Sequence, residues 1–395
     1  MNIIAKYFFS PVSIRIFTVG LNFISNVLIN RSLGLALKGQ YTTILNYANF
    51  LQLFLNLGIC YAYPLLRKKE GEEKSKEIIL TIIWLQAIIF VSASCIISAC
   101  TEIEVMVIAL LSTVLIVNSQ LVFIALIDDL KSRNLILLSS TILFIICNII
   151  CIVLAPGQLY LIVLLLIGKY FYEILAVVKF NNYAVFSLKS INREVLLTVL
   201  KIGLPTAVLA VLISCNYNID IFMLNWMKSG DKQVGIYGVA YSLTNMLWII
   251  PDAFKELIYN RTAREDNYRF VTKCIFANMA ICVIISIGFW ILGKWFLGFV
   301  YGDEYIVAFD VSMTLFCGII PMIAFKLIHP IYVNKGKSFV VVLLLCIAVV
   351  ANIISSWILI PKHGAFGAAI ASVISYTICG LLFFAKYRKD YGVNI

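Results

Sequence analysis

The sequence predicts an all-α membrane protein that crosses the bilayer about twelve times, in two bundles of six helices. Two features of its composition predict this class. Hydrophobic residues make up 62% of the 395 residues, and charged residues only 13%, about half the share usual in soluble globular proteins. The hydrophobic residues also fall into runs of about 20, the length that spans a bilayer as a helix. Lipid can cover this much apolar surface if helices satisfy the backbone groups.

The apolar runs predict twelve spans. We place them at residues 11–30, 40–63, 78–99, 104–127, 134–154, 159–179, 196–219, 234–256, 272–297, 306–330, 338–360 and 364–386. The longest connection, 66–77, reads as a mixed-charge surface connector. Lys and Arg accumulate in cytoplasmic loops. With a cytoplasmic N-terminus, the inside segments hold 21 of the 31 basic residues and the outside segments 6. We therefore expect both termini to be cytoplasmic.

The chain also repeats itself. A shift of 196 residues aligns 22–51 with 218–247, and both segments share the pattern G-x4-G-x-Y-x7-N. Six spans separate the two copies, so they have the same orientation in the membrane. Parallel repeats of this kind build transporter halves that are related by an axis along the membrane normal. We expect two bundles, residues 1–190 and 191–395, around a central cavity.

Polar residues recur at helical spacing inside the spans of both halves. The first span has Arg15, Asn22 and Asn26 on one face, the second has Asn49, and the eighth has Asn245. Polar groups at membrane depth are costly and usually face a cavity or a partner. Any single asparagine is more often a hydrogen-bonding contact between helices. The set at matched positions in both halves favours a hydrophilic, substrate-binding cavity.

Five charged residues inside the spans or at their ends are further candidates for the site. Lys169, with Glu173 one turn on, either forms a neutralising pair or faces the cavity. Lys326 either extends its ammonium toward the interface or binds substrate. Asp220 and Asp252, with Glu173, are candidates for proton or sodium coupling, although Asp220 also suits an ordinary interfacial position. With Arg15 and Lys201, the embedded cations outnumber the embedded carboxylates Glu173 and Asp252 four to two, which favours an anionic substrate such as a diphosphate.

The sequence carries no motif for catalysis, metal or nucleotide binding. P-loop, GxSxG and HExxH patterns are absent, and the eleven Cys and two His show no metal-ligand spacing. The net charge of +11 comes from short clusters between apolar runs, which argues against nucleic acid as a partner. We therefore expect no catalytic residue, metal or cofactor. Without a nucleotide site, transport of a substrate would have to be driven by an ion gradient or by the gradient of the substrate itself.

Three stretches resemble the polysaccharide transporter family (Wzx, O-antigen flippases) of the multidrug/oligosaccharidyl-lipid/polysaccharide (MOP) superfamily. They are LGLALKGQYTTILNYANFLQLFLNLGI at 33–59, DIFMLNWMKSGDKQVGIYGVAYSL at 220–243 and NIISSWILIPKHGAFGAAIASVIS at 352–375. In the last stretch Ile360-Pro361 is expected to end one helix, and small residues from Gly364 onward open the next.

The resemblance implies a flippase in the bacterial inner membrane. Its expected substrate is an undecaprenyl-diphosphate-linked oligosaccharide, moved from the cytoplasmic to the periplasmic leaflet by alternating access with proton or sodium coupling. The expected partners are this lipid-linked oligosaccharide, the bilayer and a polysaccharide polymerase. The resemblance also implies positive cavity residues that contact the diphosphate, a role that we match to Arg15 and Lys169.

Three other functions are alternatives on the sequence alone. A multidrug exporter of the same superfamily would favour an acidic and aromatic site, whereas this interior is cationic. A lipid II flippase is the second alternative, but members of that group typically have two more helices than the twelve predicted here. A membrane-embedded polysaccharide polymerase or ligase would usually carry a long periplasmic loop, whereas the predicted outside loops are short.

Overall fold

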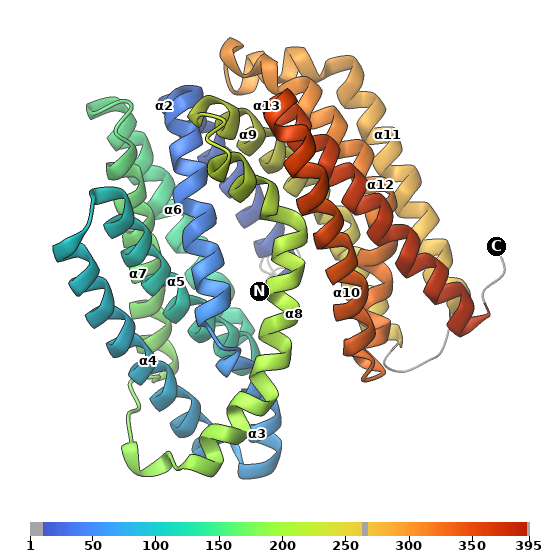
Figure 1. Cartoon of the computed structure of the whole chain (residues 1–395). Coiled ribbons are helices and arrows are strands. Elements are labelled where there is room, and N and C mark those ends of the chain that lie inside the picture. Colours follow the sequence, from blue (N-terminus) through green and yellow to red (C-terminus); the bar gives the residue numbers. More distant parts are fainter. Residues whose placement is uncertain (1–10, 263–267, 393–395) are drawn as a thin grey trace, which may run out of the picture. The chain divides into compact units, whose positions relative to one another are not determined.

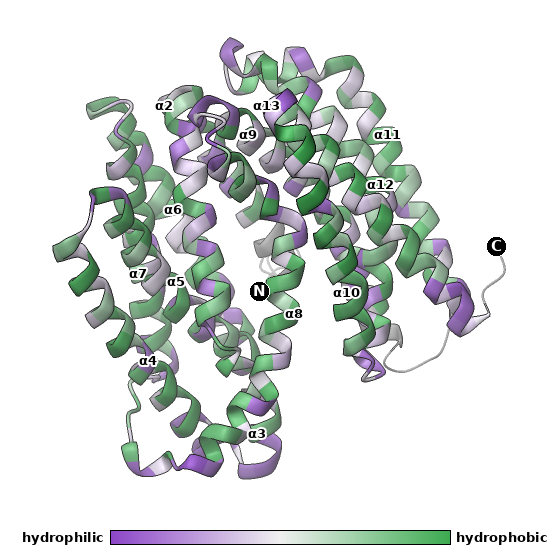
Figure 2. Ribbon diagram, viewed as in Figure 1, coloured by the Kyte–Doolittle hydropathy of each residue, from purple (hydrophilic) through white to green (hydrophobic). Residues whose placement is uncertain are grey.

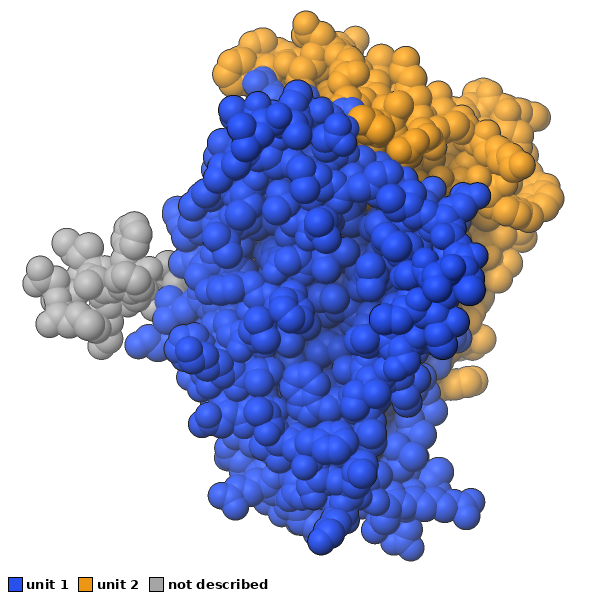
Figure 3. Space-filling view, turned by 90° about the vertical axis from the view of Figure 1, so that its left-hand side faces the viewer, with its two compact units in different colours: residues 1–33, 44–211 blue, residues 34–43, 212–395 orange. Residues whose placement is uncertain are grey.

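The computed structural model describes residues 11–262 and 268–392, without the side chains of 11–16, 256–257 and 259–262. In these ranges the chain is almost entirely helical and has no β-strand. It divides into two compact units (Figure 3). Unit 1 comprises residues 1–33 and 44–211, and unit 2 comprises 34–43 and 212–395.

The helices follow one another with short connections (Figure 1). In the first half they are α2 (Pro11–Leu55), η1 (Ile59–Ala62), α3 (Tyr63–Glu70), α4 (Glu72–Cys100), α5 (Ile103–Asp128), α6 (Leu130–Leu154), α7 (Leu159–Asn181) and η2 (Leu188–Ser190). In the second half they are α8 (Arg193–Trp226), α9 (Asp231–Leu247), α10 (Ile249–Thr262), α11 (Tyr268–Val300), η3 (Asp303–Ala308), α12 (Phe309–Asn334) and α13 (Ser338–Tyr391). The predicted connector at 66–77 is formed by the end of α3 and the start of α4, which meet at Gly71, and residues 68–74 are exposed.

The structure confirms the prediction of about twelve spans. Among the described residues nine helices are long and apolar enough to cross a membrane, and the bent pair of α2 with α3 adds a tenth. Helices α2 and α13 have 45 and 54 residues. At 1.5 Å per residue each would be more than twice as long as the roughly 30 Å apolar core of a bilayer. Each contains a glycine with non-helical dihedral angles, Gly34 (φ 68°) and Gly364 (φ 54°), and therefore supplies two spans.

Helix α13 turns back on itself at Gly364. The hydroxyl of Ser375 donates to the carbonyl oxygen of Ala348 at 2.8 Å, although 27 residues separate them. A Cβ on Gly367 would lie 2.3 Å from the carbonyl oxygen of Leu359, so the two legs touch where they meet. Figure 1 shows the two legs side by side. The helix end predicted at Pro361 lies three residues before the observed turn at Gly364. The reversal occurs at Gly364 because it needs a positive φ, which glycine adopts without steric cost.

Unit 1 has its own apolar core. It lies where α4 packs against α5 and the segments around them, and its centre includes Ile79, Leu80, Ile83, Leu121 and Ile124. The outward faces of this unit remain apolar as well, with large exposed side chains such as Ile89, Val153 and Leu154. Figure 2 shows hydrophobic residues along the helices and hydrophilic residues gathered near their ends. This distribution suits a protein whose outer solvent is lipid.

A buried carboxylate fixes one end of unit 1. Asp128 accepts hydrogen bonds from the hydroxyls of Tyr63 and Tyr183, each at 2.7 Å. It also pairs with Arg67 at 2.9 Å and Lys76 at 3.2 Å. Burial raises the pKa of Tyr183 well above its usual value, so its hydroxyl stays a donor to Asp128. These bonds join α3, α4, the end of α5 and the segment that follows α7.

The sequence repeat is also visible in the backbone of unit 2. Gly34 and Gly230, one shift of 196 residues apart, both have a positive φ. A Cβ on Gly39 would lie 1.8 Å from the carbonyl oxygen of Asp231, and one on Gly235 would lie 2.0 Å from that of Leu35. In the repeat, Gly39 corresponds to Gly235 and Asp231 corresponds to Leu35, so the two contacts are equivalent. The starts of the second leg of α2 and of α9 therefore cross in a reciprocal, closely packed contact.

Candidate functional site

Asp220 of α8 lies at the centre of a fully buried polar cluster in unit 2. Its carboxylate accepts hydrogen bonds from the hydroxyls of Ser372 at 2.6 Å, Tyr237 at 3.0 Å and Ser356 at 3.3 Å. The amide of Asn352 lies 3.5 Å away. The donors come from α9 and from both legs of α13, which the turn at Gly364 brings together.

This cluster can hold a proton or a small cation. A buried carboxylate is costly unless a positive charge or several hydrogen bonds compensate it. Within the described part of the chain, no Lys, Arg or His pairs with Asp220 at 4.0 Å or less. Asn216, one turn earlier, accepts from Ser375 at 2.9 Å and extends the polar cluster along α8. The neighbouring oxygens of Ser356, Ser372 and Asn352 are the kind of ligand that hard cations prefer.

A second cluster in unit 2 contains a buried lysine. The ammonium of Lys326 in α12 pairs with Asp252 of α10 at 3.0 Å. It also lies 4.3 Å from the ring centroid of Trp248, at the junction of α9 and α10. Lys255, one turn after Asp252, lies 3.6 Å from the same carboxylate. Two residues that the sequence assigned to different roles, Lys326 and Asp252, thus form one ion pair.

Unit 1 contains a third buried charge, Glu173 of α7. Its carboxylate accepts from the amide of Asn118 at 2.8 Å and from the hydroxyl of Ser140 at 2.5 Å. Lys169, one turn earlier, lies 5.5 Å from the ring centroid of Phe144 and is half-buried. No ion pair within 4.0 Å joins Lys169 and Glu173 in the described structure. The i,i+4 spacing of Lys169 and Glu173 therefore does not produce a close ion pair, since Glu173 bonds to α5 and α6 instead.

The four asparagines predicted to line the cavity lie on helix surfaces. Asn22, Asn49 and Asn245 are exposed, and Asn26 is half-buried. Asn49 donates to the carbonyl oxygen four residues earlier in its own helix at 2.8 Å. Arg15 lies in the first turns of α2, outside the residues whose side chains are described.

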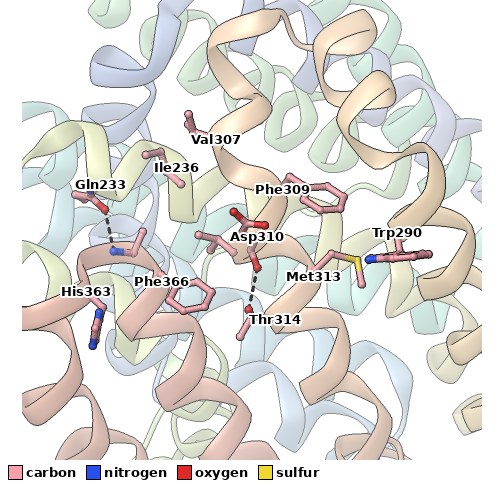
Figure 4. Close-up of a pocket in the computed structure, with 12 residues that line it drawn as sticks. Gln233, Ile236, Trp290, Val307, Phe309, Asp310, Met313, Thr314, His363 and Phe366 are labelled. Carbon is pink, nitrogen blue, oxygen red and sulfur yellow. Dashed lines mark hydrogen bonds between the residues drawn. The ribbon is translucent and has the colours of Figure 1, made fainter.

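A pocket of about 560 Å³ lies elsewhere in unit 2 (Figure 4). It is lined by residues from α9, η3, α11, α12 and the turn between the two legs of α13, among them Trp290, Asp310 and Phe366. Gln233 in its wall accepts from the backbone N–H of Ala365 at 2.9 Å, which satisfies a donor just after the Gly364 turn. The sequence did not predict this pocket, because its lining comes from five separate elements. No described group of three His, Cys, Asp or Glu is placed to hold a metal ion.

Sequence reasoning also missed several donors around the candidate site. Asn352 and Ser356 are spaced i, i+4 within a stretch noted only for its resemblance, and this spacing was the available signal. Trp248, on the same face of the eighth span as Asn245, was not predicted to contact a candidate residue. Its indole ring instead supports the ammonium of Lys326. No local pattern marks this contact, because 78 positions of sequence separate the two residues.

The fold is that of the MOP superfamily transporters. The structure of the lipid II flippase MurJ in an inward closed conformation matches it with a TM-score of 0.78 and 14% identity, over 96% of this chain and 88% of that one. A MATE family multidrug resistance transporter in an inward-facing conformation matches with a TM-score of 0.72 and 16% identity, over 95% and 94%. A MOP superfamily transporter from Pyrococcus furiosus matches with 0.65 and 16%, over 97% and 93%. At these identities the likeness shows the fold alone.

The sequence match is more specific. The profile of the family described as polysaccharide biosynthesis protein matches residues 4–250, more than half of the chain. The chain belongs to this family. A search of curated protein sequences gave no match. The family membership and the MOP fold confirm the resemblance that the sequence predicted.

Proposed function

We propose that this protein is a flippase for undecaprenyl-diphosphate-linked oligosaccharide repeat units. It would carry them from the cytoplasmic to the periplasmic leaflet of the bacterial inner membrane, for the synthesis of O-antigen, capsule or exopolysaccharide. The observation that carries the proposal is the family match over residues 4–250. The likeness to a lipid II flippase adds support, since that protein is named for a lipid-linked substrate.

The charged residues of the described structure suit this substrate. Lys326 is a buried cation beside an aromatic ring, and lysine binds phosphate through charge-assisted hydrogen bonds. Asp220 is a buried acid that can take up and release a proton or sodium ion. In this scheme ion binding at Asp220 and phosphate binding at Lys326 favour different conformations, which would couple transport to an ion gradient. The bias of basic residues favours cytoplasmic termini.

Multidrug export is the second candidate. The pocket in unit 2 combines the carboxylate of Asp310 with the aromatic rings of Trp290 and Phe366 (Figure 4). Aromatic faces and a carboxylate attract organic cations. This observation favours an exporter, whereas the family match favours the flippase.

Deletion of the gene in its native host separates the two candidates. For a flippase, lipid-linked repeat units should accumulate in the inner leaflet while surface polysaccharide disappears. Both can be measured by lipid extraction and by surface staining. Unchanged surface polysaccharide together with new sensitivity to cationic drugs would contradict the flippase and support the exporter.

Lys169→Ala is expected to lower polysaccharide export about tenfold at normal protein level. The loss of one charge-assisted hydrogen bond to the diphosphate corresponds to roughly 1.5 kcal/mol or more. Arg15→Ala should have a similar effect. Lys201→Ala is the matched control, because Lys201 is an exposed lysine of α8 and should not matter. Export can be measured by complementing the deletion strain. Normal export by both the Lys169 and Arg15 variants would remove these residues from the substrate site.

A further inference from the structure

Two lysines converge on one carboxylate in unit 2. Oδ2 of Asp252 lies 3.0 Å from Nζ of Lys326, and Oδ1 lies 3.6 Å from Nζ of Lys255. Each carboxylate oxygen thus faces its own ammonium group. Two cations around a small oxyanion are the arrangement with which proteins bind phosphate. Here a side chain of the protein itself supplies the oxyanion.

The same place contains an unused hydrogen-bond donor. Trp248, whose ring lies against the ammonium of Lys326, is only 4% exposed. Its indole N–H has no hydrogen-bond partner among the described residues. Buried tryptophan N–H groups usually find an acceptor, because leaving one unpaired is costly. An acceptor brought to this site by a ligand would remove that cost.

Lys326 and Asp252 differ in their access to solvent. The side chain of Lys326 is 9% exposed, whereas that of Asp252 is 38% exposed. A buried ammonium needs an anion beside it at all times, because an unpaired buried charge is strongly unfavourable. The carboxylate at the accessible side can leave if another anion takes its place. A phosphate group offers three acceptor oxygens, enough for both lysines and the indole N–H together.

We infer that Lys326, Lys255 and Trp248 form a phosphate-binding subsite, and that Asp252 is its resident counter-anion, which an incoming phosphate displaces. The identification of this phosphate with the diphosphate of a lipid-linked saccharide rests on the proposed function. Asp252 then lowers the affinity for phosphate, because the ligand must compete with it. It also promotes release, since it restores the pairing of Lys326 when the ligand leaves.

Binding of inorganic diphosphate to the purified full-length protein in lipid nanodiscs tests the subsite. Asp252→Asn removes the competing charge at nearly constant shape and should tighten binding about tenfold, the ratio that corresponds to roughly 1.4 kcal/mol. Lys326→Gln should weaken binding by about tenfold or more. Trp248→Phe keeps the ring beside Lys326 but removes the N–H, and should weaken binding about threefold. Isothermal titration calorimetry gives all three dissociation constants.

Lys294→Gln is the matched control. Lys294 of α11 also lies over an aromatic ring, 5.3 Å from the centroid of Phe309, but it takes no part in the subsite. Its replacement should leave diphosphate binding unchanged. Thermal unfolding in the same nanodiscs reports whether each variant is folded. If Asp252→Asn alone is unstable, the double variant with Lys326→Gln removes both charges, and it should bind as weakly as Lys326→Gln.

Unchanged or weaker binding by folded Asp252→Asn would overturn the inference, as would unchanged binding by Trp248→Phe or tight binding by the double variant. These outcomes are separate from those of the gene deletion. Intact surface polysaccharide in the deletion strain, with tighter diphosphate binding by Asp252→Asn, would refute the flippase and retain the subsite. Lost polysaccharide with no effect of Asp252→Asn on binding would retain the flippase and refute the subsite.

Discussion

Asp220→Asn is expected to reduce transport by more than about tenfold while leaving a folded protein in the membrane. Asparagine fits the same space and can still accept from the hydroxyls of Ser372 and Tyr237, which bond to Asp220. It cannot take up a proton or balance the charge of a cation, so the coupling free energy, typically 1–3 kcal/mol, would be lost. Polysaccharide export by the complemented deletion strain measures transport, and an immunoblot of membranes measures the protein level.

Two comparisons make this test specific. Asp303→Asn, at an exposed carboxylate of the same unit, should leave export unchanged. Replacing external sodium with choline, at constant pH, shows whether the wild-type protein needs sodium or a proton gradient. Full export by Asp220→Asn at normal protein level would exclude Asp220 from coupling.

Gly39→Ala should strongly destabilise the protein. The new Cβ would lie 1.8 Å from the carbonyl oxygen of Asp231, far inside van der Waals contact. A backbone oxygen cannot rotate away as a side chain can, so the crossing helices must separate. Overpacking typically costs about 1–3 kcal/mol, and a clash with backbone belongs at the upper end. Gly235→Ala should behave alike, because its Cβ would lie 2.0 Å from the carbonyl oxygen of Leu35.

Gly288→Ala is the control for this prediction. Gly288 lies in helix α11, and a Cβ there would meet no atom within 4 Å. Alanine has the better helix propensity, so this variant should be unchanged or slightly more stable. Thermal unfolding of the detergent-purified proteins compares the three variants. If Gly39→Ala unfolds at the same temperature as Gly288→Ala, the close crossing is absent.

Much of the fold could be predicted from the sequence, because span length and hydrophobicity are local properties. The repeat also identified Gly34 and Gly230, which both adopt a positive φ. The turn in the last pair of spans was placed at Pro361, although the reversal occurs at Gly364. Proline is a strong helix breaker by propensity, but the chain needs a positive φ to reverse.

The candidate site was less predictable. Asp220 could be singled out because it follows Asn216 and Asn218 at the outer end of a predicted span. The pairing of Lys326 with Asp252 has no local signal, since the two residues lie on helices distant in sequence. Spacing suggested a pair between Lys169 and Glu173, but tertiary contacts to Asn118 and Ser140 direct the Glu173 carboxylate elsewhere. Side-chain direction depends on neighbours that a single sequence does not reveal.

The reciprocal crossing of Gly39 with Asp231 and of Gly235 with Leu35 has the geometry of an isologous interface, in which the same patch serves both partners. Such an interface normally joins two identical subunits, and every substitution then occurs twice. Covalent fusion of the two copies removes that constraint, so each can change alone. One half can therefore carry Asp220 and the pair of Lys326 with Asp252, while the other carries different buried charges, such as Glu173.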